Sequence, residues 1–276
     1  MREGKARLGH EDRPQASAGP YPAPKGGRAM FGGDLMMALD PVRFSRSIGI
    51  EPDGWQADVL RTEGKRVILN CSRQSGKSTT TATKALHKAV YTPNSLVLIG
   101  SPGMRQSGEL FRKVRHAYGQ MAQRPTLLEE NKTSLAFANG SRIVSLPGEA
   151  ATVRGYSGVN LLLIDESAQV DDAFYHAVLP MLIASDGQLV LMSTPFGKRG
   201  FFHSEWATGG DEWQRTQITA AMCPRIKPEQ LERQRQSMGD LFFSQEYECE
   251  FVETDAQAFS YDLIMRAFTD EFVPLL

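Results

Sequence analysis

Two short polar segments carry the residue types best suited to chemistry, and each follows a run of apolar residues. The first is CSRQSGKS at residues 71–78, and the second is Asp165-Glu166 at the end of LLLIDE. The first approaches the phosphate-binding pattern G-x-x-x-x-G-K-[ST], but Cys71 replaces the first glycine and an arginine lies inside the loop. The alternatives are a specialised nucleotide site, a broken one and a chance match.

Residues 71–78 have the composition of a loop that binds phosphate. A tight loop between a strand and a helix directs successive backbone N–H groups into one concavity, where they can bind phosphate oxygens. Gly76 would let the backbone approach closely, Lys77 would reach the β- and γ-phosphates, and the Ser78 hydroxyl would bind Mg²⁺. The predicted ATP-binding residues of this segment are Ser72, Arg73, Gln74, Ser75, Gly76, Lys77 and Ser78.

The acid pair Asp165-Glu166 is suited to the second half of such a site. Four apolar residues precede it and predict a buried strand, at whose exit two carboxylates are costly without a cation or hydrogen bonds. Mg²⁺ bound through Asp165 would stabilise the pair, and Glu166 could act as general base on the attacking water. The alternative is an acid pair that caps the next helix. The two segments together favour the nucleotide site.

These segments need a scaffold that brings strand ends together, and the chain from about residue 40 predicts one. Short apolar runs such as RVILNC and SLVLIG alternate with helical stretches. Continuous apolar strands indicate a sheet buried on both faces, and the alternation indicates a doubly wound, mostly parallel α/β sheet. Ligands of such sheets bind beyond the carboxyl ends of the strands. Asn139-Gly140, between two alternating runs, predicts a β-hairpin.

Composition divides the chain into four predicted regions. Residues 1–35 are rich in Gly, Pro, Ala and Arg, which predicts a disordered arm, and residues 36–221 carry the predicted core. Residues 222–258 are polar and helical in pattern and are predicted to form a lid or linker. Residues 259–276 are predicted to be a tail or the start of a further domain.

Charge and cysteine content limit the classes of partner and compartment. The formal net charge of −1 gives no overall basic signature, so any contact with nucleic acid must come from a local patch. The three cysteines fit no disulfide framework or metal pattern, which favours a reducing compartment. No apolar run approaches the roughly 20 residues that a membrane-spanning helix needs. The candidates for a basic patch are Arg105, Arg112, Lys113, Lys198 and Arg199.

Five motifs follow one another along the chain: PDGWQADVL, CSRQSGKS, VRGYSGVNLLLIDES, LMSTPFGKRGFFHSEW and SQEYECEFVETDAQAFS. In this order and spacing they resemble the ATPase part of the terminase large subunit, the DNA-packaging motor of tailed bacteriophages. The resemblance covers about residues 40–262. In the same order, the motifs are similar to the family's adenine-side motif, its deviant phosphate loop, its Arg-Gly segment with the acidic strand, its coupling motif and its join to the nuclease domain.

The resemblance implies a RecA-like P-loop NTPase (ASCE) core with a small helical lid subdomain, and it assigns further roles. Gln56 would read the adenine edge, and Ser193 and Thr194 would couple the γ-phosphate to neighbouring segments. Arg154 would reach the nucleotide of a neighbouring subunit as the arginine finger, with Arg73 as a local sensor and γ-phosphate contact. The residues alone leave open a surface glutamine, a turn before Pro195 and ion-paired arginines.

The implied function is Mg²⁺-dependent ATP hydrolysis that drives viral double-stranded DNA into a procapsid in the host cytoplasm. The implied partners are double-stranded DNA bound without sequence preference, a portal protein, a small terminase subunit and further copies of the chain in a ring. We expect no nuclease activity, because the acidic residues near the C-terminus are too scattered for a metal site. The alternatives are a helicase-like or other DNA-dependent ATPase and a truncated nucleotide-binding assembly module with little activity.

Overall fold

An eight-stranded mixed sheet forms the centre of the computed structural model, which describes residues 32–146, 153 and 155–253. The order across the sheet is β3-β4-β5-β2-β6-β7-β1-β8. Only the β3–β4 and β4–β5 pairs among these strands are antiparallel. The strands are β1 (Arg66–Cys71), β2 (Leu96–Gly100), β3 (Leu127–Glu130), β4 (Ser134–Phe137), β5 (Arg142–Ser145), β6 (Leu161–Asp165), β7 (Gln188–Ser193) and β8 (Trp213–Ile218).

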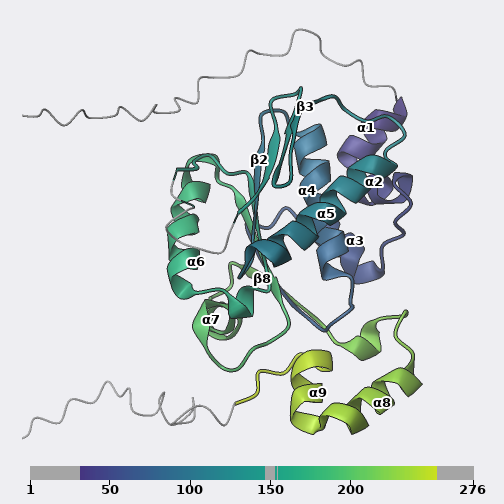
Figure 1. The fold of residues 1–276 in the computed structure, drawn as a ribbon, viewed down its shortest axis with the longest axis vertical. Coiled ribbons are helices and arrows are strands. Elements are labelled where there is room, and N and C mark those ends of the chain that lie inside the picture. Colours follow the sequence, from purple (N-terminus) through teal and green to yellow (C-terminus); the bar gives the residue numbers. More distant parts are fainter. Residues whose placement is uncertain (1–31, 147–152, 154, 254–276) are drawn as a thin grey trace, which may run out of the picture.

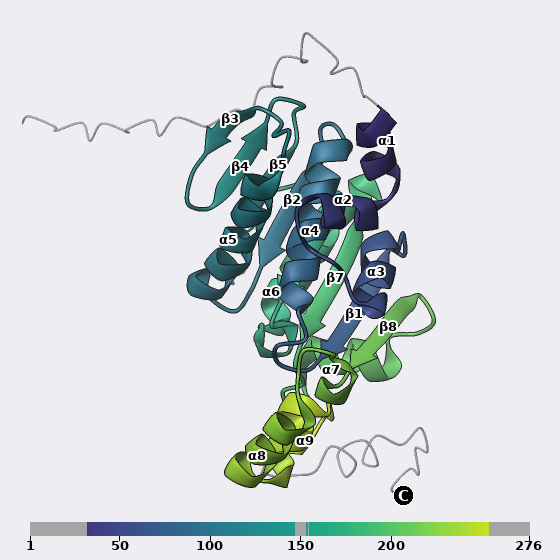
Figure 2. The same cartoon turned by 90° about the vertical axis from the view of Figure 1, so that its right-hand side faces the viewer.

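Helices cover both faces of the sheet, as the sequence predicts for a doubly wound α/β fold (Figure 1). Figure 2 shows α4 and α5 in front of the strands, and Figure 1 places α6 and α7 on the other side. The elements of the first face are α1 (Gly32–Leu39), α2 (Pro41–Ser47), α3 (Gly54–Arg61), α4 (Lys77–Tyr91) and α5 (Met104–Gln120). Those of the second face are α6 (Asp172–Val178), the 3-10 helix η2 (Leu179–Ser185) and α7 (Gly200–Thr208).

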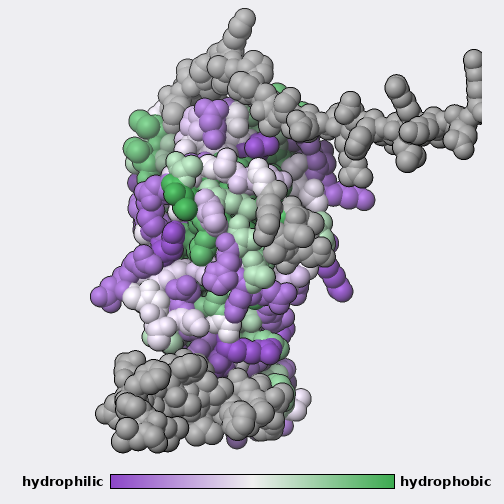
Figure 3. All heavy atoms as spheres, turned by 90° about the vertical axis from the view of Figure 1, so that its left-hand side faces the viewer, coloured by the Kyte–Doolittle hydropathy of each residue, from purple (hydrophilic) through white to green (hydrophobic). Residues whose placement is uncertain are grey.

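The core lies in two layers because successive side chains of a strand point to opposite faces. Along β1, Val67 and Leu69 pack in the layer under α3 to α5, and Ile68 packs in the layer under α6 and α7. The middle residues of β1, β2, β6 and β7 are a continuous apolar run, as expected for strands buried on both faces. Over the side of the molecule that bears α6, hydrophilic and hydrophobic residues are interspersed (Figure 3).

The strand order brings three separate segments of the sequence to one edge. β7 lies between β1 and β6 and is parallel to both. Because parallel strands point the same way, the residues that follow β1, β6 and β7 meet at one edge of the sheet. Those residues are the loop after Cys71, the pair Asp165-Glu166, and Ser193-Thr194. The fold class is thus confirmed, and it positions the predicted site.

Two local predictions have clear outcomes. The hairpin at Asn139-Gly140 is confirmed, since β4 and β5 pair in antiparallel fashion across it and Gly140 has a φ of 84°. The boundary of the N-terminal arm is wrong at residues 32–35, because α1 begins at Gly32 and Tyr91 donates a hydrogen bond to Asp34 of that helix at 3.1 Å. Residues 1–31 and 254–276 lie outside the described part of the chain.

A short helical unit follows β8 and lies at the carboxyl end of the strands (Figure 2). It consists of the 3-10 helix η3 (Ala220–Met222), α8 (Pro228–Met238) and α9 (Asp240–Tyr247). This position next to the strand ends is where a lid over a nucleotide would lie. The position agrees with the lid assignment for residues 222–258, which stays a prediction. In the described ranges, no helix has both the length and the apolar character needed to cross a bilayer.

Candidate nucleotide site

The loop between β1 and α4 makes a sharp turn that depends on two residues with left-handed backbone conformation. Gln74 has a φ of 60° and Gly76 a φ of 98°. The φ of Gly76 strongly favours glycine, and a Cβ atom there would lie 2.5 Å from Nε2 of Gln56 and displace that amide. Cys71 is fully buried at the end of β1, and burial raises the pKa of its thiol to about 12. These facts agree with Cys71 as a strand-end residue outside the loop's concave side.

The loop and the acid pair are in direct contact. Lys77 Nζ lies 3.2 Å from Oε1 of Glu166, and Ser78 Oγ donates to Oδ2 of Asp165 at 3.4 Å. Asp165 is only 7 % exposed. Burial, and then the neighbouring carboxylate of Glu166, raise the pKa of Asp165 to about 6, although the ammonium of Lys77 opposes the shift. The structure thus brings together the four residues that the sequence predicts for phosphate, metal and water.

Glu166 is held in an unusual backbone conformation next to the end of β7. Its φ of 50° and ψ of 43° lie in the left-handed region, which is costly for a glutamate. Ser193 Oγ donates to Oε2 of Glu166 at 3.4 Å, and Ser193 and Thr194 are both buried. Ser193 therefore contacts the predicted general base, and a change at the acid pair can reach β7 through it.

The oxygens of this site suit a magnesium ion. Mg²⁺ takes hard oxygen ligands and is usually bound by one or two carboxylates together with substrate phosphates and water. The hydroxyl of Ser78 and the buried carboxylate of Asp165, 3.4 Å apart, supply such oxygens. Within the described ranges, no cluster of three or more His, Cys, Asp and Glu side chains could hold a metal by protein ligands alone. The donor set thus fits a metal shared with a phosphate ligand.

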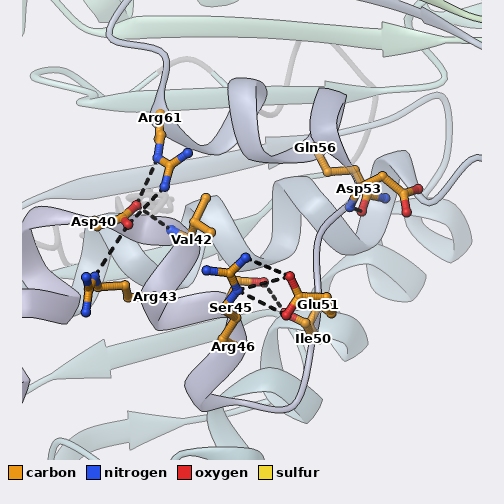
Figure 4. Close-up of polar contacts among 10 residues, drawn as sticks. All are labelled: Asp40, Val42, Arg43, Ser45, Arg46, Ile50, Glu51, Asp53, Gln56 and Arg61. Atoms are coloured by element: carbon orange, nitrogen blue, oxygen red, sulfur yellow. Dashed lines mark hydrogen bonds and ion pairs between the residues drawn. The ribbon is translucent and has the colours of Figure 1, made fainter.

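Gln56 lies beside the loop and has both ends of its amide in use. Oε1 accepts from the backbone N–H of Asp53 at 2.9 Å, which closes a capping box at the start of α3 (Figure 4). Nε2 donates to the carbonyl of Ser75 at 3.4 Å. The predicted role of Gln56 at the adenine stays a prediction, and the contacts add a second role, since Gln56 braces the loop against α3.

Arg73 connects the loop to the helical unit. Its side chain pairs with Glu246 of α9, and its backbone N–H donates to the carbonyl of Glu246 at 3.1 Å. Asn70, in β1, adds a hydrogen bond of 2.8 Å to the carbonyl of Cys249, just after α9. The position of α9 is therefore tied to the strand and loop that would hold the phosphates, which suits the predicted sensor role of Arg73.

The contacts of the other predicted arginines and lysines do not decide their roles. Arg154 lies outside the described residues. Arg112 pairs with a glutamate one turn away, Lys198 lies 3.4 Å from Glu253, and Arg199 lies over the ring of Phe196. Lys113 lies close enough to Asp165 for its charge to stabilise that carboxylate. The predicted DNA-binding patch therefore stays a prediction.

Comparison with known proteins identifies the family of this chain. The family model described as terminase large subunit, T4likevirus-type, N-terminal, matches residues 68–266, which is more than half of the chain. The chain belongs to the terminase large subunit family. The terminase large subunit of Thermus virus P23-45 is 25% identical over 253 residues, covering 79% of this chain and 52% of that protein. The large subunit of Escherichia phage T5 is 28% identical over 228 residues, covering 76% and 50%.

Solved terminase structures share the fold. The ATPase domain of the Thermus phage P74-26 large terminase aligns with a TM-score of 0.65 at 22% identity, covering 76% of this chain and 98% of that one. The large terminase of another thermophilic bacteriophage, in complex with ADP, aligns with a TM-score of 0.60 at 13% identity, covering 73% and 54%. The chain spans about half the length of the curated terminase relatives it matches.

A buried carboxylate with a raised pKa should make this terminase chain less stable as the pH rises. Unfolded Asp165 loses its proton near its ordinary pKa of 3.8, whereas the folded state keeps that proton up to about pH 6. The folded state therefore binds more protons between these values, and the stability contributed by this group falls across that window. When no metal is present, the free energy of unfolding of Asp165→Asn should exceed that of the unchanged chain by about 1–3 kcal/mol above pH 6.

Urea unfolding in the presence of a chelator, measured at several values between pH 4 and 8, checks this expectation. The advantage of Asp165→Asn should grow from about pH 4 to about pH 6 and then stay constant. Asp211→Asn, at an exposed aspartate ahead of β8, is the matched control and should show no such window. An equal stability of Asp165→Asn and the unchanged chain at pH 7.5 would contradict the assigned burial of the carboxylate.

Sequence reasoning missed two residues that contact the candidate site. Glu246, the partner of Arg73, lies in a motif that was interpreted only as the join to another domain. Arg225 lies in an irregular segment between η3 and α8, where no motif draws attention to it, yet it donates to the carbonyl of Ser75 at 2.9 Å. For Arg225, the one available signal in the sequence was its position as a basic residue near the start of the predicted lid.

Proposed function

We propose that this chain hydrolyses ATP with Mg²⁺ and that the reaction drives double-stranded DNA into a viral procapsid. The observation that carries the proposal is the contact between the loop and the acid pair, Lys77 with Glu166 and Ser78 with Asp165. Membership of the terminase large subunit family supports it. Solved complexes of a related large terminase from a thermophilic bacteriophage with ADP and with ATP-γ-S support a nucleotide as the ligand.

Each side chain of the site has a proposed task. The backbone N–H groups of the loop and the ammonium of Lys77 bind the β- and γ-phosphates. Ser78 and Asp165 hold the Mg²⁺ ion, which neutralises charge on the phosphate oxygens when bound. Glu166 orients the attacking water and accepts its proton. Because a triphosphate competes with Glu166 for Lys77, nucleotide binding leaves the carboxylate available for the water.

The partners follow from the family and are part of the proposal. We propose a ring of identical subunits on a portal protein, with a small terminase subunit as partner and the host cytoplasm as the place of action. Contacts with DNA would be made to phosphates and without sequence preference. Arg154 would act on the nucleotide of the neighbouring subunit, which makes full activity a property of the ring.

Stimulation of hydrolysis by procapsids tests the proposal. Phosphate release from MgATP should be slow for the purified chain and should rise at least about tenfold when procapsids that carry a portal are added, since each subunit then gains a neighbour's arginine. Procapsids without a portal are the control. Hydrolysis with no response to portal-bearing procapsids would overturn the motor function. Absence of ATP hydrolysis in both conditions would overturn the enzymatic function as well.

Arg73→Ala should leave the fold intact and lower hydrolysis by about 10²-fold, the loss typical of one charge-stabilising donor in an active site. Arg73 is exposed, so its loss should not disturb packing. Steady-state phosphate release in the presence of procapsids checks the rate, and circular dichroism checks the fold. Arg112→Ala, at an exposed arginine paired within α5, is the control.

Glu246→Gln separates two ways in which Arg73 could act. If Arg73 contacts the γ-phosphate itself, Glu246→Gln frees the guanidinium and should retain most hydrolysis. If Arg73 acts through the position of α9, Glu246→Gln should lower the rate about as much as Arg73→Ala. The proposal predicts the first result, and full activity of Arg73→Ala with procapsids would refute the role of Arg73.

A further inference from the structure

Arg225 is an exposed arginine on the segment that leads from the core into α8, and it is anchored to the nucleotide loop. Its guanidinium forms an ion pair with the carboxylate of Asp53: NH1 donates to Oδ1 at 2.9 Å, and NH2 lies 2.8 Å from Oδ2. NH2 also donates to the carbonyl of Ser75 at 2.9 Å. Two charge-assisted hydrogen bonds from different nitrogens, one to Asp53 and one to Ser75, hold the guanidinium in place.

The contacts of Arg225 close a ring of hydrogen bonds that includes Gln56. Asp53 binds Arg225 through its carboxylate and Gln56 through its backbone N–H, at 2.9 Å. The carbonyl of Ser75 accepts from Arg225 at 2.9 Å and from Gln56 at 3.4 Å. Three segments far apart in the sequence, at residues 53–56, at Ser75 and at Arg225, are therefore held together on one side of the loop.

A hollow of about 300 Å³ lies against this ring, and its lining includes Gln56, Gly76, Thr79, Thr83 and Arg225. A volume near 300 Å³ is at the lower end of the range for sites of small molecules. Half of the side-chain surface of Arg225 is exposed, and Arg225 lines the hollow, so a ligand there can contact its side chain. A planar, fixed guanidinium stacks well on an aromatic base.

The charge of Arg225 favours a base over a phosphate as its ligand. The carboxylate of Asp53 neutralises the guanidinium in an ion pair, so little net charge remains to attract an anion. The phosphate contacts of the proposed function involve Lys77 and the backbone that follows Gly76. Arg225 lies next to Gly76 beside Gln56, and its guanidinium NH2 is 3.3 Å from the place of a Cβ on that glycine.

We propose that Arg225 determines the base specificity of the nucleotide site: its guanidinium stacks on the purine, and its contacts with Asp53 and Ser75 hold the Gln56 amide toward the edge of the base. This inference rests on the proposed ATP site. It also gives a physical link from the base to α8, because Arg225 lies three residues before that helix begins at Pro228.

Calorimetric titration of the full chain with MgATP, MgGTP and inorganic triphosphate tests this role. Arg225→Ala should weaken ATP binding about tenfold, which is the loss of one anchored cation–aromatic contact. Its preference for ATP over GTP should fall, and its affinity for inorganic triphosphate should stay the same. Arg225→Lys should recover less than half of the lost binding free energy, since an ammonium cannot stack as a plane. Arg233→Ala, at an exposed arginine of α8, is the control.

The possible outcomes separate this inference from the proposed function. If the unchanged chain binds ATP and Arg225→Ala binds it equally well, the role of Arg225 is overturned and the ATP site stands. An equal loss of affinity for ATP and for inorganic triphosphate would overturn the base contact in favour of a phosphate contact. If the unchanged chain binds no ATP, the proposed function fails and this inference fails with it.

Discussion

Glu166→Gln should reduce ATP hydrolysis by about 10²–10⁴-fold, the range for removing a positioned general base, and should leave ATP binding intact. Glutamine has nearly the same shape as glutamate, so the site keeps its packing, but an amide cannot accept the proton of the attacking water. The 3.2 Å ion pair between Lys77 and Glu166 is lost, which leaves Lys77 free for the phosphates. The affinity for ATP should therefore stay the same or increase.

Steady-state phosphate release with procapsids and equilibrium titration with MgATP together check this prediction. Glu63→Gln is the matched control, because Glu63 is exposed and precedes β1, at the edge of the sheet opposite the loop. It should hydrolyse ATP at the rate of the unchanged chain. More than a tenth of the normal rate in Glu166→Gln would show that Glu166 is not the general base.

Arg154→Ala should lower hydrolysis by about 10³–10⁵-fold in assembled rings, which is the effect of an arginine finger, and should have little effect on the purified subunit. The transferring phosphoryl group needs more positive charge than the loop itself supplies. Lys77 and Arg73 are the proposed phosphate contacts within the subunit, but the carboxylate of Glu246 beside Arg73 offsets part of its charge. A guanidinium from the neighbouring subunit would meet this need only when the ring is formed.

A mixing experiment decides whether Arg154 acts across the subunit interface. Rings assembled from equal amounts of Arg154→Ala and Glu166→Gln subunits contain sites that join an intact Glu166 to a neighbour's intact Arg154. Half of the sites keep Glu166, and half of those have such a neighbour, so about a quarter of the sites should hydrolyse ATP. If Arg154 acts on its own subunit's nucleotide, both kinds of subunit are inactive and mixing restores nothing.

The sequence could predict the residues at the strand ends because their positions follow from the fold. Strands that are apolar throughout must lie inside a sheet, and parallel strands place their carboxyl ends at one edge. Lys77, Ser78, Asp165, Glu166 and Ser193 all follow or end such strands, and the structure brings them together. The hairpin at residues 139–140 could be predicted for a local reason, because Asn-Gly favours its turn.

The partners of these residues could not be predicted, because nothing local in the sequence specifies them. Glu246 meets Arg73 only because α9 returns to the end of β1, and Arg225 reaches Ser75 from an irregular segment. Both contacts depend on how the helical unit docks, and the residues of that unit have no strand pattern to fix their place. The start of α1 was missed because Gly32 and Gly33 are typical of a flexible arm.

The most direct test of the account is the structure of the Glu166→Gln protein with ATP and Mg²⁺, because this variant should hold the nucleotide without hydrolysing it. The account predicts the phosphates against the loop that ends at Lys77, and the metal between the oxygens of Ser78 and Asp165. It predicts the base beside Gln56 and Arg225. A nucleotide bound elsewhere, or a metal that Asp165 does not contact, would contradict the central claim.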